Sequence, residues 1–173
     1  AINLDLRTAW IPRTWNQEAD DISKNDDVDC WAVSNSFFEK VQKLMGQVFA
    51  VDVFSDSENF KVKKFYSRWS CPGSSGVDGL SHSWSNDVIY ACPPRSLILQ
   101  TINKFVKDKA VGILVFPIPG EGIVSTIWDS PHVKVGLKGR WQYIAQGVTH
   151  CRVPAFYGET FRGKLAVVKL DYS

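Results

Sequence analysis

Three short apolar runs alternate with longer amphipathic stretches along the chain. Residues 48–54, 87–91 and 111–116 are apolar runs, and polar residues or proline bound each of them. Apolar runs of this length, rich in Val, Ile and Phe, are typical of strands that are covered on both faces. We therefore predict three buried strands. We expect Pro93 and Pro117 to end the second and the third, because proline cannot donate to the ladder of a central strand.

Two other stretches have the spacing of amphipathic helices. In the first, Ser36 and Glu39 form the pattern of a capping box, and Gly46 fits the residue that follows the last helical turn. The second helix is expected to begin after the prolines that end the second strand. The apolar positions of the two predicted helices are Phe37, Phe38, Val41, Leu44 and Met45, and then Leu97, Ile98, Thr101, Ile102, Phe105 and Val106.

The order strand, helix, strand over residues 87–116 predicts a right-handed crossover between parallel neighbours. Residues 141–145 and 165–172 have the composition of two further strands, which we expect to be antiparallel at an edge of the sheet. The elements together predict an α/β fold. It has a mostly parallel sheet with helices on both faces and antiparallel C-terminal strands.

Composition limits the size and the setting of this fold. The chain has 173 residues, of which 45% are hydrophobic, enough for one domain with a packed core and a short appendage. The net charge of +2 is too small to attract nucleic acid through the bulk field, so any such binding must depend on locally clustered basic residues. No apolar run is long enough to span a membrane, and the first seven residues lack the apolar core of a signal peptide. We expect no membrane partner.

The four cysteines do not have the spacing of a metal site. No two of them form a CxxC pair, and His150 and Cys151 are adjacent, which is poor geometry for two ligands of one ion. We therefore expect no bound metal. Unpaired thiols of this kind are typical of a reduced cytoplasmic or nuclear protein.

Residues 10–23 carry the first of two family resemblances. The segment W-I-P-R-T-W-N-Q-E-A-D-D-I-S resembles the closing segment of RNase H domains in retroelement reverse transcriptases. The resemblance implies that Asp20 is the last of several carboxylates holding two Mg²⁺ ions, since two-metal hydrolysis of a phosphodiester needs clustered carboxylate oxygens. One aspartate cannot form that site. We therefore expect no RNase H activity from this chain and interpret Asp20 here as a solvated helix residue.

The polar, acidic stretch after this segment predicts a domain boundary. We assign residues 1–24 to the C-terminal tail of an RNase H-like domain and residues 25–35 to a linker. Residues 36–173 are then one α/β domain.

An ordered set of motifs over about residues 48–118 carries the second resemblance. In chain order they are V-D-V-F-S-D-S-E-N from Val51, K-F-Y from Lys64, V-D-G-L from Val77, S-W from Ser83, Y-A-C-P-P from Tyr90 and G-I-L-V-F-P from Gly112. This order is similar to that of phage-type Dam-like adenine-N6 DNA methyltransferases. DIRS-like tyrosine-recombinase retrotransposons carry such a domain after RNase H, and related retroelements keep a degenerate version. The resemblance implies a Rossmann-like methyltransferase fold, with reverse transcriptase and RNase H modules as partners in one polyprotein.

The motif that does the chemistry in this family is altered here. The family has a (D/N/S)-P-P-(Y/F) loop, in which the first side chain and a proline carbonyl accept hydrogen bonds from the target amine, and the aromatic residue stacks on the flipped base. Cys92, Pro93, Pro94 and Arg95 occupy these positions. A thiol is a weak acceptor, and the charge of Arg95 is unfavourable beside a positive sulfonium. We expect the catalytic loop to be inactive.

The resemblance also implies a site for S-adenosylmethionine at the carboxyl ends of the parallel strands. Asp52 and Ser55 match the cofactor-side motif of the family, and Asp78 matches a further acidic position. Glycine-rich backbone is absent near Asp52, and Phe54 replaces a small residue. We therefore expect no cofactor, or S-adenosylmethionine if the pocket is retained. The alternative role of Asp52 is to cap or pair within the fold.

A basic and aromatic segment over residues 60–69 is a candidate for nucleic-acid binding. Lysines alternate with aromatic residues there, and a basic groove with aromatic platforms suits single-stranded DNA or RNA. The alternative is a solvated edge strand that lysines protect against pairing with other chains. The candidate contact residues are Lys61, Lys63, Lys64, Tyr66, Arg68 and Trp69.

Three functions from different classes follow. We expect a non-catalytic, methyltransferase-like domain, a pseudoenzyme, in a retroelement-derived reverse transcriptase and RNase H polyprotein. Its role would be structural support or nucleic-acid binding. The first alternative is an active S-adenosylmethionine-dependent adenine-N6 DNA methyltransferase. The second is a protein–protein interaction module, which predicts a contiguous apolar surface patch.

Overall fold

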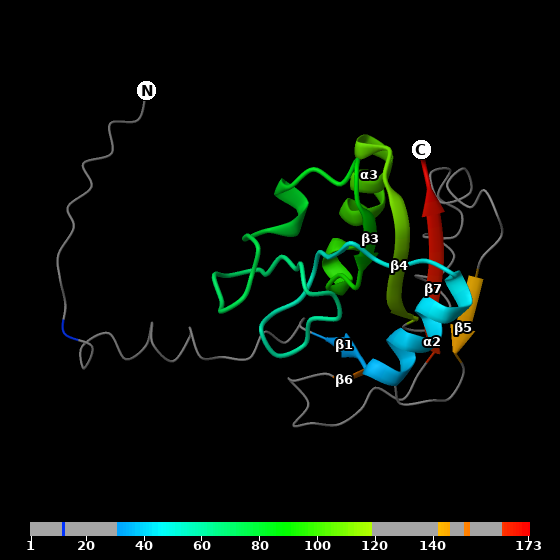
Figure 1. Ribbon diagram of the computed structural model, residues 1–173, viewed down its shortest axis with the longest axis horizontal. Helices are drawn as coiled ribbons and strands as arrows, with labels where there is room; N and C mark the ends of the chain where they lie inside the picture. The colour runs from blue at the N-terminus through cyan, green and yellow to red at the C-terminus, as the bar shows by residue number, and fades with distance from the viewer. Residues whose placement is uncertain (1–11, 13–30, 119–141, 146–150, 153–163) are drawn as a thin grey trace.

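The computed structural model describes residues 12, 31–118, 142–145, 151–152 and 164–173. Most of the RNase H-like segment, including Asp20, therefore lies outside the described residues. The main sheet has five strands in the order β2-β3-β4-β7-β5 (Figure 1). Their bounds are β2 Val51–Asp52, β3 Val88–Ala91, β4 Val111–Ile118, β5 Gln142–Ala145 and β7 Lys164–Asp171.

The sheet is mixed, with a parallel part and an antiparallel part. Strands β2, β3 and β4 run parallel, whereas β7 is antiparallel to both β4 and β5. The prediction of an α/β fold with antiparallel C-terminal strands is confirmed. Strand β7 lies between β4 and β5, so that β5 forms the edge of this part of the sheet.

Two α-helices accompany the sheet. Helix α2 (Asn35–Met45) crosses in front of the lower ends of β4 and β7 in Figure 1, and α3 (Ile98–Asp108) connects β3 to β4. The predicted N-cap of the first helix is wrong. The cap is Ser34, whose hydroxyl accepts from the backbone N–H of Phe37, and Ser36 lies inside the helix. Gly46 ends α2 in the left-handed conformation, as the sequence predicts.

The core covers both faces of the central strands. Ile89, Tyr90 and Ala91 follow one another on β3 and are all buried, and successive side chains of a strand point to opposite faces. The Tyr90 ring meets the Phe38 ring of α2 edge-on, with 5.0 Å between centroids. Helix α2 therefore covers the face of Tyr90, which leaves the opposite face to α3 and its buried residues Ile98, Thr101, Ile102 and Phe105.

A separate two-stranded ribbon contains β1, the strand that comes just before α2 in the chain. Strand β1 (Ala32–Val33) pairs antiparallel with β6 (Cys151–Arg152), outside the main sheet. Trp31 and Val33 are buried in the same core cluster as the main sheet. The folded unit therefore extends back at least to Trp31, into residues that the sequence assigns to the linker.

Two predicted strand ends differ from the structure. Only residues 51 and 52 of the predicted strand 48–54 form a ladder. Strand β4 continues through Pro117 to Ile118, because its pairing with β3 stops at Leu114 while its pairing with β7 continues. Pro117 lies beyond the part of β4 that pairs with β3, so its missing N–H removes no bond from that ladder.

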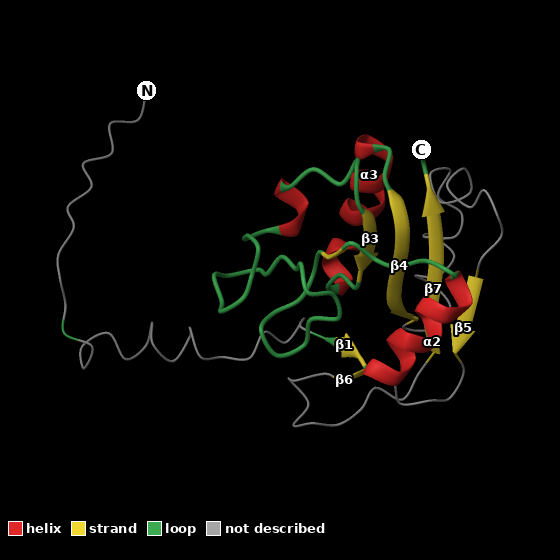
Figure 2. Ribbon diagram, in the orientation of Figure 1, coloured by secondary structure: helices red, strands yellow, loops and turns green. Residues whose placement is uncertain are grey.

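The chain between β2 and β3 is almost wholly loop, with one 3₁₀-helix, η2 (Gly79–Ser81) (Figure 2). Residues 60–69, for which a solvated edge strand was the alternative to a nucleic-acid-binding segment, form no regular strand. Instead, isolated bridges join Asp52 to Phe65 and Ser67 to Val77. Backbone bonds from Asp52 N–H to Lys64 O and from Tyr66 N–H to Asp52 O hold this segment along β2. The segment thus protects the outer edge of the sheet without becoming a regular strand.

Within the described residues, no helix is long and apolar enough to cross a membrane.

Gly112 on β4 provides a test of the close approach between the parallel strands. A Cβ added there would fall on the carbonyl oxygen of Ile89, its register partner on β3. We expect Gly112→Ala to lower the free energy of unfolding by at least about 2 kcal/mol, because the backbone of a central ladder cannot move aside. Urea unfolding measures the loss. The control is Gly46→Ala, which has open space and a φ of +60° and should cost only about 1 kcal/mol. An equal loss in both variants would contradict this packing.

Candidate functional site

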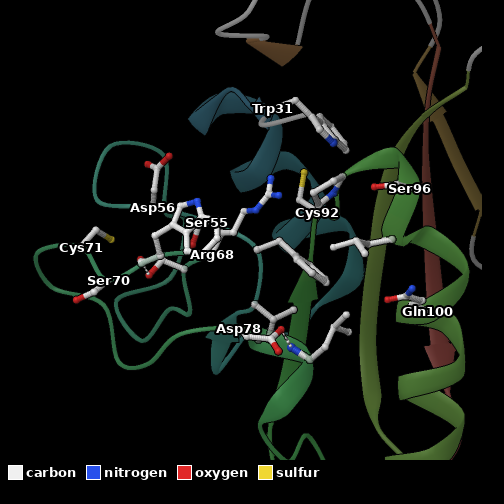
Figure 3. Close-up of a pocket in the computed structure, with 18 residues that line it drawn as sticks. Trp31, Ser55, Asp56, Arg68, Ser70, Cys71, Asp78, Cys92, Ser96 and Gln100 are labelled. Atoms are coloured by element: carbon white, nitrogen blue, oxygen red, sulfur yellow. Dashed lines mark hydrogen bonds between the residues drawn. The ribbon is translucent and has the colours of Figure 1, made fainter. Parts of the chain in front are cut away.

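A cavity of about 610 Å³ lies at the carboxyl ends of β2 and β3. Its walls come from the loop after β2, from residues 67–71, from η2, and from the loop between β3 and α3 (Figure 3). Parallel strands place their carboxyl ends at the same edge of a sheet, and ligand sites of open α/β sheets form at that edge. The volume is in the range of small-molecule sites.

The pocket brings together residues from three of the sequence motifs. Ser55 follows β2, Asp78 caps η2, and Cys92 and Pro94 follow β3; all four line the cavity. Figure 3 shows Trp31 next to Cys92 at one end and Asp78 at the other. Arg68 and Trp69 of the basic and aromatic segment also contribute to the lining. The remaining candidates, Asp52, Lys61, Lys63, Lys64, Tyr66, Pro93 and Arg95, are not among the lining residues.

The loop that carries the altered motif is held by Trp31. The indole Nε1–H of Trp31 donates to the carbonyl oxygen of Pro93 at 2.8 Å, and both residues are buried. Trp31 was not predicted as a site residue, because it lies in the segment assigned to the linker. The one signal for it in the sequence was a large aromatic residue between the acidic stretch and the first predicted helix. Arg95 is exposed at the start of η3 (Arg95–Leu97), the short turn that leads into α3.

Asp52 lies beneath the pocket rather than in its wall. Its side chain is fully buried and accepts from the backbone N–H groups of Phe54 and Lys61, at 3.3 and 3.0 Å. Burial raises the pKa of the Asp52 carboxyl to about 6, and the two hydrogen bonds oppose this only in part. Asp52 therefore has a structural role. Its carboxylate connects the start of the 61–66 segment to the end of β2.

Ser55 is a buried polar residue of the pocket wall and lies close to Asp52. Its hydroxyl is near enough to the Asp52 carboxylate to help lower its pKa. Among the described residues, the Ser55 oxygen has no partner at hydrogen-bond distance. A buried hydroxyl without a partner costs free energy, and a ligand in the pocket could supply one.

The D-G-L-S-H-S-W motif forms a closed turn on the opposite wall. Asp78, at a φ of 55°, caps η2 by accepting from the Leu80 N–H at 3.2 Å. Gly79 has no room for a Cβ, which would fall on the carbonyl oxygen of Val53. The fully buried indole of Trp84 donates to Gly79 O at 2.9 Å. These contacts are sufficient to explain why Asp78, Gly79 and Trp84 have this spacing in the sequence, because the shape of the turn requires it.

The candidate nucleic-acid contacts are not equivalent. The Nζ of Lys61 donates to Asn35 Oδ1 at 2.7 Å, and that of Lys64 pairs with Asp87 at 2.7 Å. Tyr66 is buried and stacks on His82, with 4.0 Å between the ring centroids. Trp69, in contrast, is 71% exposed, and the Arg68 guanidinium lies 5.4 Å from its ring centroid. Lys63 is also exposed. Of these candidates, only Arg68 and Trp69 are both exposed and part of the pocket lining.

Within the described residues, no group of three or more His, Cys, Asp or Glu side chains is arranged to hold a metal ion. Cys71 and Cys92, neither of which forms a disulfide, both line the pocket. The polar lining consists mainly of serines, two aspartates, Gln100 and Arg68. This composition suits a polar organic ligand better than an ion.

Comparison with known protein families finds no family model that matches the chain, and comparison with curated proteins finds no matching sequence.

The raised pKa of Asp52 predicts a pH dependence of stability. A carboxyl whose pKa is higher in the folded state than in the unfolded state, about 3.9, holds its proton more tightly when folded. The contribution of Asp52 to the free energy of unfolding is therefore greatest below about pH 4, and it falls as the pH rises toward 6. Relative to Asp52→Asn, the wild-type chain should lose on the order of 2–3 kcal/mol of unfolding free energy between pH 4 and pH 7.

Urea unfolding of both proteins at several pH values measures this difference, in which the contributions of other groups cancel. The control is Asp108→Asn. Burial raises the pKa of Asp108, but hydrogen bonds from Lys104 and Trp84 outweigh it and lower the net value. Its difference from wild type should be flat above pH 4. If the difference in unfolding free energy between the wild type and Asp52→Asn is also independent of pH, burial does not raise the pKa of Asp52.

Proposed function

We propose that this chain contains a non-catalytic, methyltransferase-like domain from a retroelement-derived reverse transcriptase and RNase H polyprotein. The domain supports the neighbouring modules and contributes an exposed aromatic surface for single-stranded nucleic acid. The mixed α/β sheet and the pocket at the carboxyl ends of β2 and β3 agree with the Rossmann-like fold that the motif order implies. The fact that four residues of the family-like motifs line this pocket also supports the proposal; they are Ser55, Asp78, Cys92 and Pro94.

The observation that carries the proposal is the bond between Trp31 and Pro93. In the family, a proline carbonyl of this loop accepts a hydrogen bond from the target amine. Here the buried Pro93 carbonyl already accepts from an indole of the same chain, and the neighbouring acceptor is a thiol, Cys92. Two of the groups that would activate an amine are thus occupied or weak. Arg95, at the aromatic position, is exposed outside the pocket.

Nucleic-acid binding is favoured by Trp69 and Arg68. An indole that is 71% exposed beside a guanidinium offers a base a flat apolar face and a phosphate a positive charge. Lys61 and Lys64 are bound to Asn35 and Asp87, so we assign the contact to the exposed residues Trp69 and Lys63 and to Arg68, whose guanidinium lies beside the Trp69 ring. Asp56 and Asp78 also line the pocket, and their negative charges disfavour a phosphate inside it.

A methyl-transfer assay tests the non-catalytic assignment. With labelled S-adenosylmethionine and DNA containing unpaired adenine, we expect no incorporation above a blank without protein, even at equimolar protein. Calorimetric titration with S-adenosylmethionine is a separate measurement on the same preparation. Heat without transfer would mean that the pocket is retained for the cofactor. Incorporation above the blank would establish the alternative, an active adenine-N6 methyltransferase.

Titration of a fluorescent single-stranded oligonucleotide at low salt tests the binding surface. We expect Trp69→Ala to weaken binding about fivefold or more, since stacking on one base contributes about 1–3 kcal/mol. Affinity should also fall steeply with added salt. Lys64→Ala is the matched control and should change affinity little, because Lys64 is paired with Asp87. If the wild-type chain does not bind at low salt, the protein–protein interaction alternative replaces this part of the proposal.

A further inference from the structure

The charged residues that line the pocket come from different walls. Arg68 belongs to the segment of residues 67–71. Asp56 comes from the loop after β2, and Asp78 is the residue that caps η2. In Figure 3 the Arg68 side chain points toward the Cys92 end of the pocket, and Asp78 lies at the opposite end. A ligand in the pocket therefore meets a positive charge on one side and a negative charge on another.

The two carboxylates differ in what they offer to a ligand. Asp56 accepts from the backbone N–H groups of Glu58 and Asn59 and from the Asn59 amide, all within its own turn. Asp78 is exposed, and its Oδ1 accepts from the Leu80 N–H. Among the described residues, no donor lies at hydrogen-bond distance from Asp78 Oδ2. Asp56 therefore adds negative charge, whereas Asp78 also provides a hydrogen-bond acceptor.

Trp69 provides the flat surface on which the proposed function places a base. Its indole is 71% exposed and lines the same pocket as Arg68 and Asp78. A nucleotide inside a strand has a phosphodiester on both sides of its sugar, so a pocket with carboxylates on one side repels one of the two. A terminal nucleoside has a phosphodiester on one side and a hydroxyl on the other. A hydroxyl donates to a carboxylate, and the charge pattern of a strand end therefore matches that of the pocket.

We propose that the pocket binds an unphosphorylated terminal nucleoside of a single strand. The base stacks on Trp69, the one phosphodiester lies on the Arg68 side, and the free terminal hydroxyl donates to Asp78. The volume of about 610 Å³ is sufficient for a ligand of this size. This inference rests on the proposed function, since it names the part of the strand that the surface binds. It leaves the bond between Trp31 and Pro93 intact.

Competition between short strands tests the inference on the unmodified protein. Unlabelled hexanucleotides of one sequence carry no terminal phosphate, a 5′-phosphate or a 3′-phosphate, and displace an internally labelled strand at low salt. Binding through backbone phosphates alone predicts that the phosphorylated strands bind equally well or more tightly, because they are more negative. We expect at least one terminal phosphate to weaken binding about fivefold or more, because it meets the Asp78 carboxylate. The phosphate that does so identifies the end that enters the pocket.

Asp78→Asn tests the residue that is assigned to the terminal hydroxyl. The asparagine amide oxygen can still accept from the Leu80 N–H, and asparagine tolerates the left-handed conformation at this position. The loss of affinity that a terminal phosphate causes should disappear in this variant. Glu39→Gln is the control, because it removes the same charge from an exposed position of α2 outside this pocket. The effect of the terminal phosphate should persist in the control.

The outcomes separate this inference from the proposed function. If phosphorylated and unphosphorylated strands compete equally, or if the effect of the phosphate persists in Asp78→Asn, the inference is overturned and nucleic-acid binding by the domain still stands. If no strand binds the wild-type chain at low salt, the inference fails together with the nucleic-acid part of the proposed function. If Asp78→Asn does not fold, the competition on the unmodified protein decides alone.

Discussion

The buried carboxylate of Asp52 fixes the wall on which the pocket depends. Its two oxygens accept from the backbone N–H groups of Phe54 and Lys61, which lie two and nine residues further along the chain. Its own backbone bonds to Lys64 and Tyr66. The loop after β2 and the segment that carries Arg68 and Trp69 are thereby held together at the end of one very short strand. The burial that makes these bonds strong also raises the pKa of Asp52 to about 6. Ionising this carboxyl in the folded protein therefore costs free energy, although its bonds hold the pocket wall together.

The sequence predicts the elements of this fold well where periodicity and packing agree. The helices and the strands β3, β4 and β7 were recognisable because each buries several apolar positions. Local patterns were less reliable. Ser34 outcompetes Ser36 as the cap because the helix starts two residues earlier, and Pro117 stays in its strand because the neighbouring strand has already ended. Both outcomes depend on register, which short-range patterns do not contain.

The candidate site was predictable in part for a topological reason. Ser55, Asp78 and the loop of Cys92 and Pro94 come from separate parts of the sequence, and the structure brings them to one cavity at the carboxyl ends of β2 and β3. Asp52 lies outside the cavity wall, where its carboxylate accepts from the backbone N–H groups of Phe54 and Lys61. Residues 60–69 alternate like a strand, yet Phe65, Tyr66 and Ser67 are all buried in succession. Side-chain alternation therefore failed where the backbone follows an edge by isolated bridges instead of a ladder.

The contact between Trp31 and Pro93 changes what the pocket requires of a ligand. A loop that exposes a carbonyl inside a cavity is stable only if water, substrate or protein supplies a donor. A catalytic loop can leave that place to its substrate and accept the cost when it is empty. In this chain the donor is covalently attached, so the loop keeps its shape without any ligand. The same bond explains how the pocket can keep its geometry beside a thiol and an exposed arginine, since packing within the chain holds the loop in place.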